Sequence, residues 1–100
     1  MGGDSYAWEK LHIAVLILAA GTGSLRERLE EAYVSSLIRL HSKYQFPWND
    51  IRRDFDDLMQ EIAPARDLTV ALSRWSEEDL RRIAEGIVSL YDRVLRKTID

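Results

Sequence analysis

The sequence predicts an all-α protein, a single-domain bundle of four long helices plus one short helix. Three observations lead to this prediction. Apolar residues recur at steps of three and four along most of the chain, and two segments begin with the serine signal that starts a helix. No segment shows sustained alternation of apolar and polar residues. Because no linker is long enough to divide the chain, we expect one helical domain over residues 1–100, with residues 1–4 as a flexible lead.

The composition limits the functions that the chain can have. Of its 100 residues, 46% are hydrophobic and 31% are charged, which is typical of one domain with a single core. Cysteine is absent, which excludes disulfides, thiolate metal sites and a cysteine nucleophile. The longest uninterrupted apolar run, residues 13–20, is far shorter than the roughly 18 to 20 residues that cross a bilayer. We therefore expect a cytoplasmic protein without a membrane partner.

The first helix is predicted to start at Ser5, whose side chain suits an N-cap, and to end where Gly21 can take a left-handed conformation. Its inward stripe consists of apolar residues at three- and four-residue steps: Trp8, Leu11, Val15 and Leu18. Further apolar residues lie on its other faces: Ile13, Ala14, Ile17 and Ala19. A helix that is apolar on several faces is typically buried, so we expect this one to be the central helix.

The second helix begins with a sharper signal. Ser24 is followed three residues later by Glu27, the spacing of a capping box, in which each side chain accepts a hydrogen bond from the other residue's backbone N–H. One face of about five turns then carries an apolar stripe: Leu25, Leu29, Tyr33, Leu37, Leu40 and Tyr44.

The third helix is expected to carry Pro47 in its first turn and to stop at Pro64. Its buried side is predicted to consist of apolar residues at helical spacing: Trp48, Ile51, Phe55, Leu58, Met59 and Ile62. Residues 68–75 are few and evenly apolar, and we favour a single short helix there.

The last helix repeats the capping-box spacing with Ser76 and Asp79. Its core face is again apolar: Leu80, Ile83, Ala84, Ile87, Tyr91, Val94 and Leu95. Acidic residues gather at its start and basic residues at its end, as the helix macrodipole favours. Gly86 in its middle costs about 1 kcal/mol relative to Ala, and the close approach of another helix is the most economical reason for it.

The run VLILAAGTGSLR over residues 15–26 resembles the signature of sugar-phosphate nucleotidyltransferases, in which an apolar strand leads into a glycine loop around nucleotide phosphates. The resemblance implies ligand binding by Gly21, Gly23 and Ser24, because glycine lets backbone N–H groups approach a phosphate closely. Arg26 would be the basic neighbour, one position late because Leu25 is inserted. That family has a doubly wound parallel sheet, and nothing after Ser24 is typical of a strand. We favour the alternative, a helix end at Gly21, a short turn and a helix start at Ser24.

Glu9 and His12 have the Glu-x-x-His spacing that places a carboxylate and an imidazole on one helix face. Di-iron bundles use two such pairs, but the second histidine, His41, has Ile38 at the required position. A homodimer could bring two Glu9/His12 pairs together to bind metal, whereas the ordinary explanation is a contact on the helix surface. We expect no cofactor, and we expect His41 to be partly buried and hydrogen-bonded rather than a catalytic base.

Two arginine pairs, at residues 52–53 and 81–82, raise the question of nucleic acid. Residues 46–63 carry two basic and five acidic groups, and the whole chain has a net charge of −3. Such a field repels phosphate, so we expect local ion pairs rather than binding to DNA or RNA.

Wide apolar stripes without a catalytic constellation favour a non-enzymatic helical bundle that acts through protein-protein contact, as a homodimer. The alternative is an enzyme or binder of a small ligand, nucleotide or metal that uses the turn at residues 21–26 or the Glu9/His12 pair. The segments LAAGTGSLRERLEEAY, FPWNDIRRDF and SEEDLRRIAEGIVSLYD resemble those of small bacterial all-helical proteins of unknown function. This resemblance implies a helical fold and no particular activity.

Overall fold

A computed structural model describes residues 2–63 and 74–99, and every element in these two ranges is helical. The elements are α1 (Gly2–Ala20), α2 (Leu25–Ala32), the π-helix η1 (Tyr33–Leu37), α3 (Ile38–Lys43), α4 (Asn49–Ile62) and α6 (Glu77–Ile99). The all-α prediction is confirmed. The short helix expected at residues 68–75 lies for the most part outside the described residues, and residues 74 and 75 are not helical.

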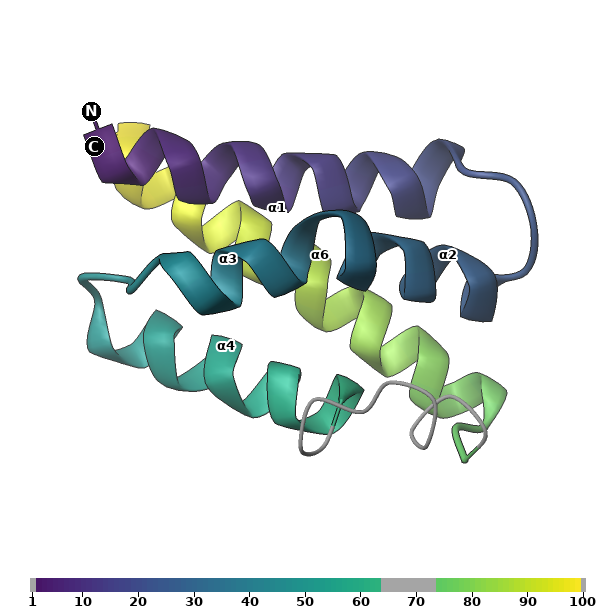
Figure 1. Ribbon diagram of the computed structural model, residues 1–100. Helices are drawn as coiled ribbons and strands as arrows, with labels where there is room; N and C mark the ends of the chain where they lie inside the picture. Colours follow the sequence, from purple (N-terminus) through teal and green to yellow (C-terminus); the bar gives the residue numbers. More distant parts are fainter. Residues whose placement is uncertain (1, 64–73, 100) are drawn as a thin grey trace.

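The helices form two crossed layers (Figure 1). α1 and α4 lie above and below the continuous helix made of α2, η1 and α3, and α6 crosses behind them, ending near the start of α1. α6 packs against α1, α2 and α4, and α1 packs against α2, η1 and α6. No helix in the described part of the chain is long and apolar enough to cross a membrane.

The buried core takes residues from every long helix. Its largest fully buried side chains are Phe46, Phe55, Leu11, Leu37, Leu40, Ile51, Met59, Ile62, Leu80, Ile83, Ile87 and Val94. These are mainly the stripe residues that the helical spacing predicts, with Phe46 added from the connection before α4. Within α1, the buried line runs through Ala7, Leu11, Ala14 and Leu18, while Trp8 and Val15 are half-buried.

The prediction that the first helix is central is wrong. α1 lies at the edge of the bundle, and its outward side chains Ile13 and Leu16 are 38% and 50% exposed. α2, η1 and α6 cover one side of α1, and no described residue covers the other. The central positions belong to the α2–η1–α3 helix and to α6.

Three predicted helix ends also differ from the structure. α1 begins at Gly2 rather than Ser5, so residues 2–4, the expected lead, continue this helix. A cap preference of about 1 kcal/mol does not prevent a further turn from forming its own backbone hydrogen bonds. α4 begins at Asn49, and Pro47 precedes its first turn because the extended Trp48 stands at the N-cap. The left-handed glycine is Gly23, with φ 92°, rather than Gly21.

Gly21 has a steric rather than a conformational role. Its N–H donates to the carbonyl oxygen of Ile17 at 2.9 Å, which continues the hydrogen bonding of α1. A Cβ at this position would overlap that carbonyl oxygen and would lie 3.3 Å from Cγ of Arg28. The absence of a side chain therefore allows the Arg28 side chain to lie across the end of α1.

Both capping boxes are confirmed. The backbone N–H of Glu27 donates to Oγ of Ser24 at 3.1 Å, and the Ser24 N–H donates to Oε1 of Glu27 at 2.9 Å. At the start of α6, the two corresponding distances between Ser76 and Asp79 are both 3.1 Å. Each box pairs backbone donors that would otherwise have no partner within the helix.

The contact between α4 and α6 explains Gly86. A Cβ at Gly86 would lie 3.3 Å from Cδ1 of Leu58, which is tighter than ordinary van der Waals contact. The close helix approach predicted from this glycine is therefore present, and Leu58 is the side chain that occupies the space.

The π-helix η1 was not predicted. Its hydrogen-bond pattern is marked by the N–H of Ile38, which donates to the carbonyl of Tyr33 five residues earlier. Ser36 is fully buried in this segment, and its hydroxyl donates to the backbone carbonyl of Lys10 in α1. A buried polar side chain is thus satisfied by the neighbouring helix.

Candidate functional site

Two backbone amides of the turn at residues 21–26, those of Gly21 and Ser24, already donate hydrogen bonds within the chain. The residues before it form the helix α1 instead of the strand that the nucleotidyltransferase signature requires. The backbone N–H of Ser24 is already bonded to the Glu27 carboxylate. This hydrogen bond, followed by the one from the Ser24 hydroxyl, lowers the pKa of Glu27, so a negative charge stands where a phosphate would have to bind. Gly21, Gly23 and Ser24 are exposed, but their geometry gives no support to a phosphate site.

The arginine that spans this turn is Arg28, which lies beyond the glycine motif of residues 15–26. Its guanidinium donates to the carbonyl oxygen of Leu18 in the last turn of α1, and its Nε donates to that of Ser24 at 3.4 Å. Arg26 is directed elsewhere, because its Nη2 donates to the carbonyl oxygen of Trp75 at 2.7 Å. The two arginines connect helix ends, which is a structural use of their charge.

The side chain of His12 contacts Trp8 and Tyr91. The His12 ring stacks on Trp8, with centroids 5.0 Å apart and planes at 8°. Its Nδ1 lies 3.2 Å from the hydroxyl of Tyr91 on α6, whereas Glu9 is exposed. Within residues 2–63 and 74–99, no group of three or more His, Asp or Glu side chains is placed to hold a metal ion. His12 packs between α1 and α6, and the metal hypothesis gains no support from this arrangement.

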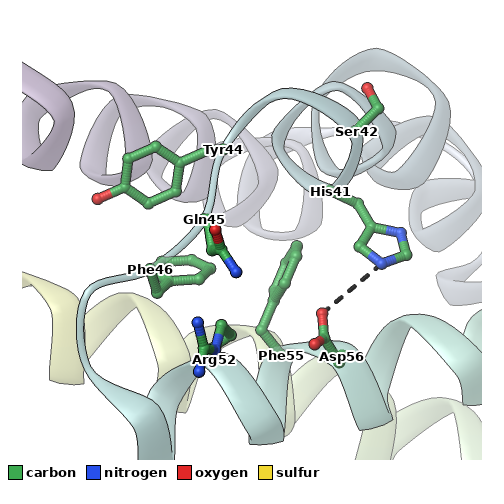
Figure 2. Close-up of a pocket in the computed structure, with 8 residues that line it drawn as sticks. All are labelled: His41, Ser42, Tyr44, Gln45, Phe46, Arg52, Phe55 and Asp56. Atoms are coloured by element: carbon green, nitrogen blue, oxygen red, sulfur yellow. Dashed lines mark ion pairs between the residues drawn. The ribbon is translucent and has the colours of Figure 1, made fainter.

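His41 lines an open hollow of about 380 Å³ between α3 and α4 (Figure 2). The half-buried imidazole has Nε2 3.7 Å from Oδ1 of Asp56, and its ring meets the edge of Phe55 at a centroid distance of 5.7 Å. Partial burial agrees with the prediction, although the partner is a carboxylate at ion-pair distance. The hydroxyl of Ser42 donates to the carbonyl of Arg39 at 3.3 Å and points away from His41. The hollow therefore contains no serine nucleophile activated by His41.

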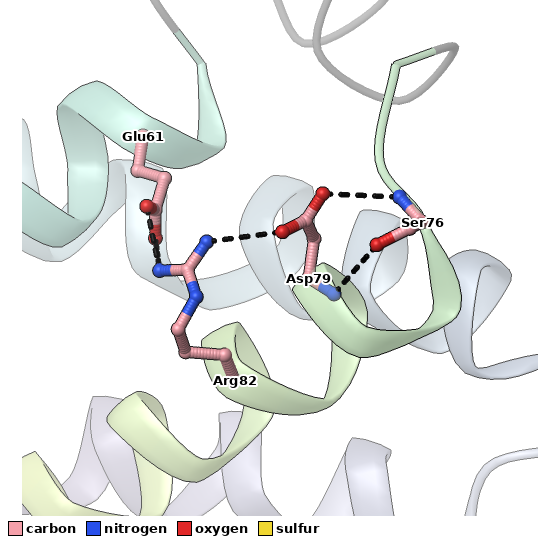
Figure 3. A network of polar contacts seen from close by, with 4 residues as sticks. All are labelled: Glu61, Ser76, Asp79 and Arg82. Atoms are coloured by element: carbon pink, nitrogen blue, oxygen red, sulfur yellow. Dashed lines mark hydrogen bonds and ion pairs between the residues drawn. The ribbon is translucent and has the colours of Figure 1, made fainter.

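Ion pairs account for most of the charge between α4 and α6. Arg82 reaches Glu61 at 2.7 Å and Asp79 at 3.4 Å, which ties the end of α4 to the capping box of α6 (Figure 3). Hydrogen bonding to Glu61 raises the pKa of Arg82. At the other end of α4, Arg93 lies 2.8 Å from Asp54 and 3.2 Å from Asp50. The predicted local use of charge is confirmed on this side of α6.

The opposite side of α6 is mainly apolar rather than charged. Here α6, α1 and the first residue of α2 enclose a shallow, mainly apolar hollow of about 370 Å³. Its lining consists of Val15, Leu18, Ala19, Leu25, Arg81, Ala84, Glu85 and Val88. Leu16 is not among the lining residues, but it lies three residues before Ala19 and is therefore its neighbour on the surface of α1. We call this hollow, together with the outward side chains Ile13 and Leu16, the α1–α6 face.

The α1–α6 face contains three of the large apolar side chains that the structure leaves exposed. Besides Ile13 and Leu16, Val88 is 45% exposed. Val34 and Ile38 form a second, smaller pair on the outer side of η1 and α3. The sequence signal for the larger face was the apolar run at residues 13–20, which we assigned to the core.

No protein-family model, no curated protein and no solved structure matches this chain. The arrangement of its own side chains is therefore the basis for assigning a function. Among the sites described above, the Ser24 amide of the turn and the His12 ring of the Glu9/His12 pair are engaged in intramolecular contacts. The α1–α6 face is mainly apolar and partly exposed, and its hollow extends over two helices.

Proposed function

We propose that this protein acts without catalysis, through protein-protein contact on the α1–α6 face, and that it forms a homodimer through this face. The observation that carries the proposal is an apolar hollow lined by Val15, Ala19, Ala84 and Val88, with the half-exposed Leu16 one helical turn before Ala19. Exposed apolar surface of this kind is costly in water, and its burial is the main favourable term in protein association.

The enzyme alternative has less support. A catalytic site needs a nucleophile, acid or base held within hydrogen-bond distance of a partner and open to a substrate. His12 packs against Trp8 and Tyr91, and the backbone amide of Ser24 is engaged by Glu27. The small-ligand, nucleotide and metal hypotheses would need these contacts to break first.

The test is a pair of matched substitutions measured by sedimentation equilibrium up to high micromolar concentration. Leu16→Glu places a charge on the α1–α6 face, and Val34→Glu places the same charge on the outer side of η1, where the native side chain is 56% exposed. We expect the wild type to form dimers, Leu16→Glu to weaken association at least about tenfold, and Val34→Glu to leave it unchanged.

Two results would contradict the proposal. One is a strictly monomeric wild type at these concentrations. The other is equal weakening by Leu16→Glu and Val34→Glu, which would mean that association does not depend on this face. Circular dichroism of each variant checks that the fold is retained, as expected for outward positions.

A further inference from the structure

Resting on the proposed function, we infer that the second copy docks on the α1–α6 face by a two-fold axis, with Arg81 of each protomer against the partner's Glu85. In this arrangement the Leu16 side chain of each copy enters the hollow of the other. The protein could still associate through this face with other contacts, and the experiments below distinguish the two cases.

The shape of the face suits a two-fold contact. Its half-exposed side chain Leu16 lies one helical turn before Ala19, which lines the hollow, and both Leu16 and the hollow are apolar. A two-fold contact requires one patch that complements itself, so that a residue i meets j on the partner while j meets i. A hollow of about 370 Å³ falls within the size range that takes a small organic ligand, so it has room for a branched aliphatic side chain.

The pattern of charges along α6 also favours a two-fold contact. Arg82, Arg93 and Arg96 each lie within 3.2 Å of a carboxylate of the same chain. Arg81 and Glu85 line the rim of the hollow, and neither makes an ion pair or hydrogen bond through its side chain with the residues that the structure describes. The two unpaired charges of the rim are thus of opposite sign and one helical turn apart.

A two-fold axis perpendicular to α6 at this rim makes the two α6 helices antiparallel. Arg81 of one copy then faces the partner's Glu85, and Glu85 faces the partner's Arg81, so both charges of each copy gain an opposite neighbour. A parallel arrangement would place like charges together, which disfavours it. Charge complementarity therefore favours a second copy of this chain as the occupant of the face, in antiparallel orientation.

Charge exchange at the rim tests the inference. Arg81→Glu gives two acidic residues at the rim, and Glu85→Arg gives two basic residues. We expect each single variant to dimerise about tenfold more weakly than the wild type at low salt, because two attractive contacts per dimer become repulsive. The double exchange, Arg81→Glu with Glu85→Arg, should recover dimerisation to within about threefold, because both contacts are again between opposite charges.

Mixing gives the sharper result. An equimolar mixture of the two single variants should form a heterodimer stronger than either homodimer, since the acidic rim of one meets the basic rim of the other. The differences should shrink in about 1 M salt, where the screening length falls to about 3 Å. Arg39→Glu, an exposed position on α3, serves as the control and should leave dimerisation unchanged.

The outcomes separate this inference from the proposed function. Rescue by the double exchange and heterodimer formation on mixing support the two-fold arrangement. If Leu16→Glu dissociates the dimer but the single exchanges have no effect, or the double exchange brings no recovery, the antiparallel pairing is overturned and the proposed function stands. A wild type that never associates overturns both.

Discussion

Removal of the Arg28 side chain should destabilise the fold, although this residue is only half-buried. Its guanidinium donates to the Leu18 carbonyl at the end of α1 and its Nε donates to the Ser24 carbonyl. α1 has no basic residue in its own last turn, so Arg28 supplies a cation at the negative end of that helix. Hydrogen bonds with a charged partner contribute about 1.5 to 3 kcal/mol, and partial exposure favours the lower end of this range. We expect Arg28→Ala to lower the free energy of unfolding by about 1.5 kcal/mol.

Urea unfolding followed by far-ultraviolet circular dichroism, at one fixed protein concentration, measures this change. Arg28→Lys should give an intermediate loss, because lysine keeps the charge but cannot present two donors in a fixed plane. Arg39→Ala is the matched control on the same continuous helix, and it should change the free energy by less than about 0.5 kcal/mol. If Arg28→Ala and Arg39→Ala unfold at the same urea concentration, the guanidinium does not stabilise the end of α1 and the reasoning is refuted.

Two further predictions concern helix starts and helix packing. Backbone hydrogen bonds from Ser24 and Ser76 are the main cause of the lowered pKa values of Glu27 and Asp79. The ionised carboxylates therefore stabilise the fold above the ordinary carboxyl pKa, and this contribution is lost as pH falls through the lower pKa of the folded state. The free energy of unfolding should therefore decrease at acid pH, and a Glu27→Gln, Asp79→Asn double variant should show a shallower decrease; an unchanged slope would contradict this. Gly86→Leu should cost about 1 to 3 kcal/mol in thermal or urea unfolding, because Leu58 fills the space, and Leu58→Ala in the same chain should recover part of that loss. If the double variant loses as much free energy of unfolding as the two single variants together, the two side chains do not compete for the same space.

Local signals in the sequence predicted the helix starts well. The capping boxes at Ser24 and Ser76 join residues only three positions apart, so their geometry follows from the spacing alone. The buried stripes of α4 and α6 were also predictable, because a helix repeats its inward face every 3.6 residues. The close approach at Gly86 was also predictable, because a glycine in the middle of a helix lowers stability and is best explained by a close neighbour.

Features that depend on distant parts of the chain could not be predicted. Arg28 bonds to a carbonyl ten residues away, and its position depends on how the turn at residues 21–24 folds back. The hydrogen bond from Ser36 to Lys10 likewise needs the packing of η1 on α1. No periodic pattern distinguishes a π-helical segment from the surrounding α-helix.

The candidate site illustrates the same limit. The sequence showed that α1 is apolar on several faces, and the expectation of a central helix assumed that the chain itself would cover them. The structure leaves Ile13 and Leu16 outside the core, because the helices that pack most closely on α1, namely α2, η1 and α6, leave these two side chains exposed. Apolar periodicity shows which faces require burial, but it does not show whether the same molecule or another one provides the cover.

The contact between Glu61 and Arg82 also joins two helix ends that are distant in sequence. These residues stand on either side of the connection between α4 and α6, and their 2.7 Å contact helps to hold the ends of that connection together. Because the same guanidinium also reaches Asp79, one arginine links the end of α4 to the capping box of α6. A change at residue 61 should therefore be felt at the start of α6, although the two positions are distant in sequence.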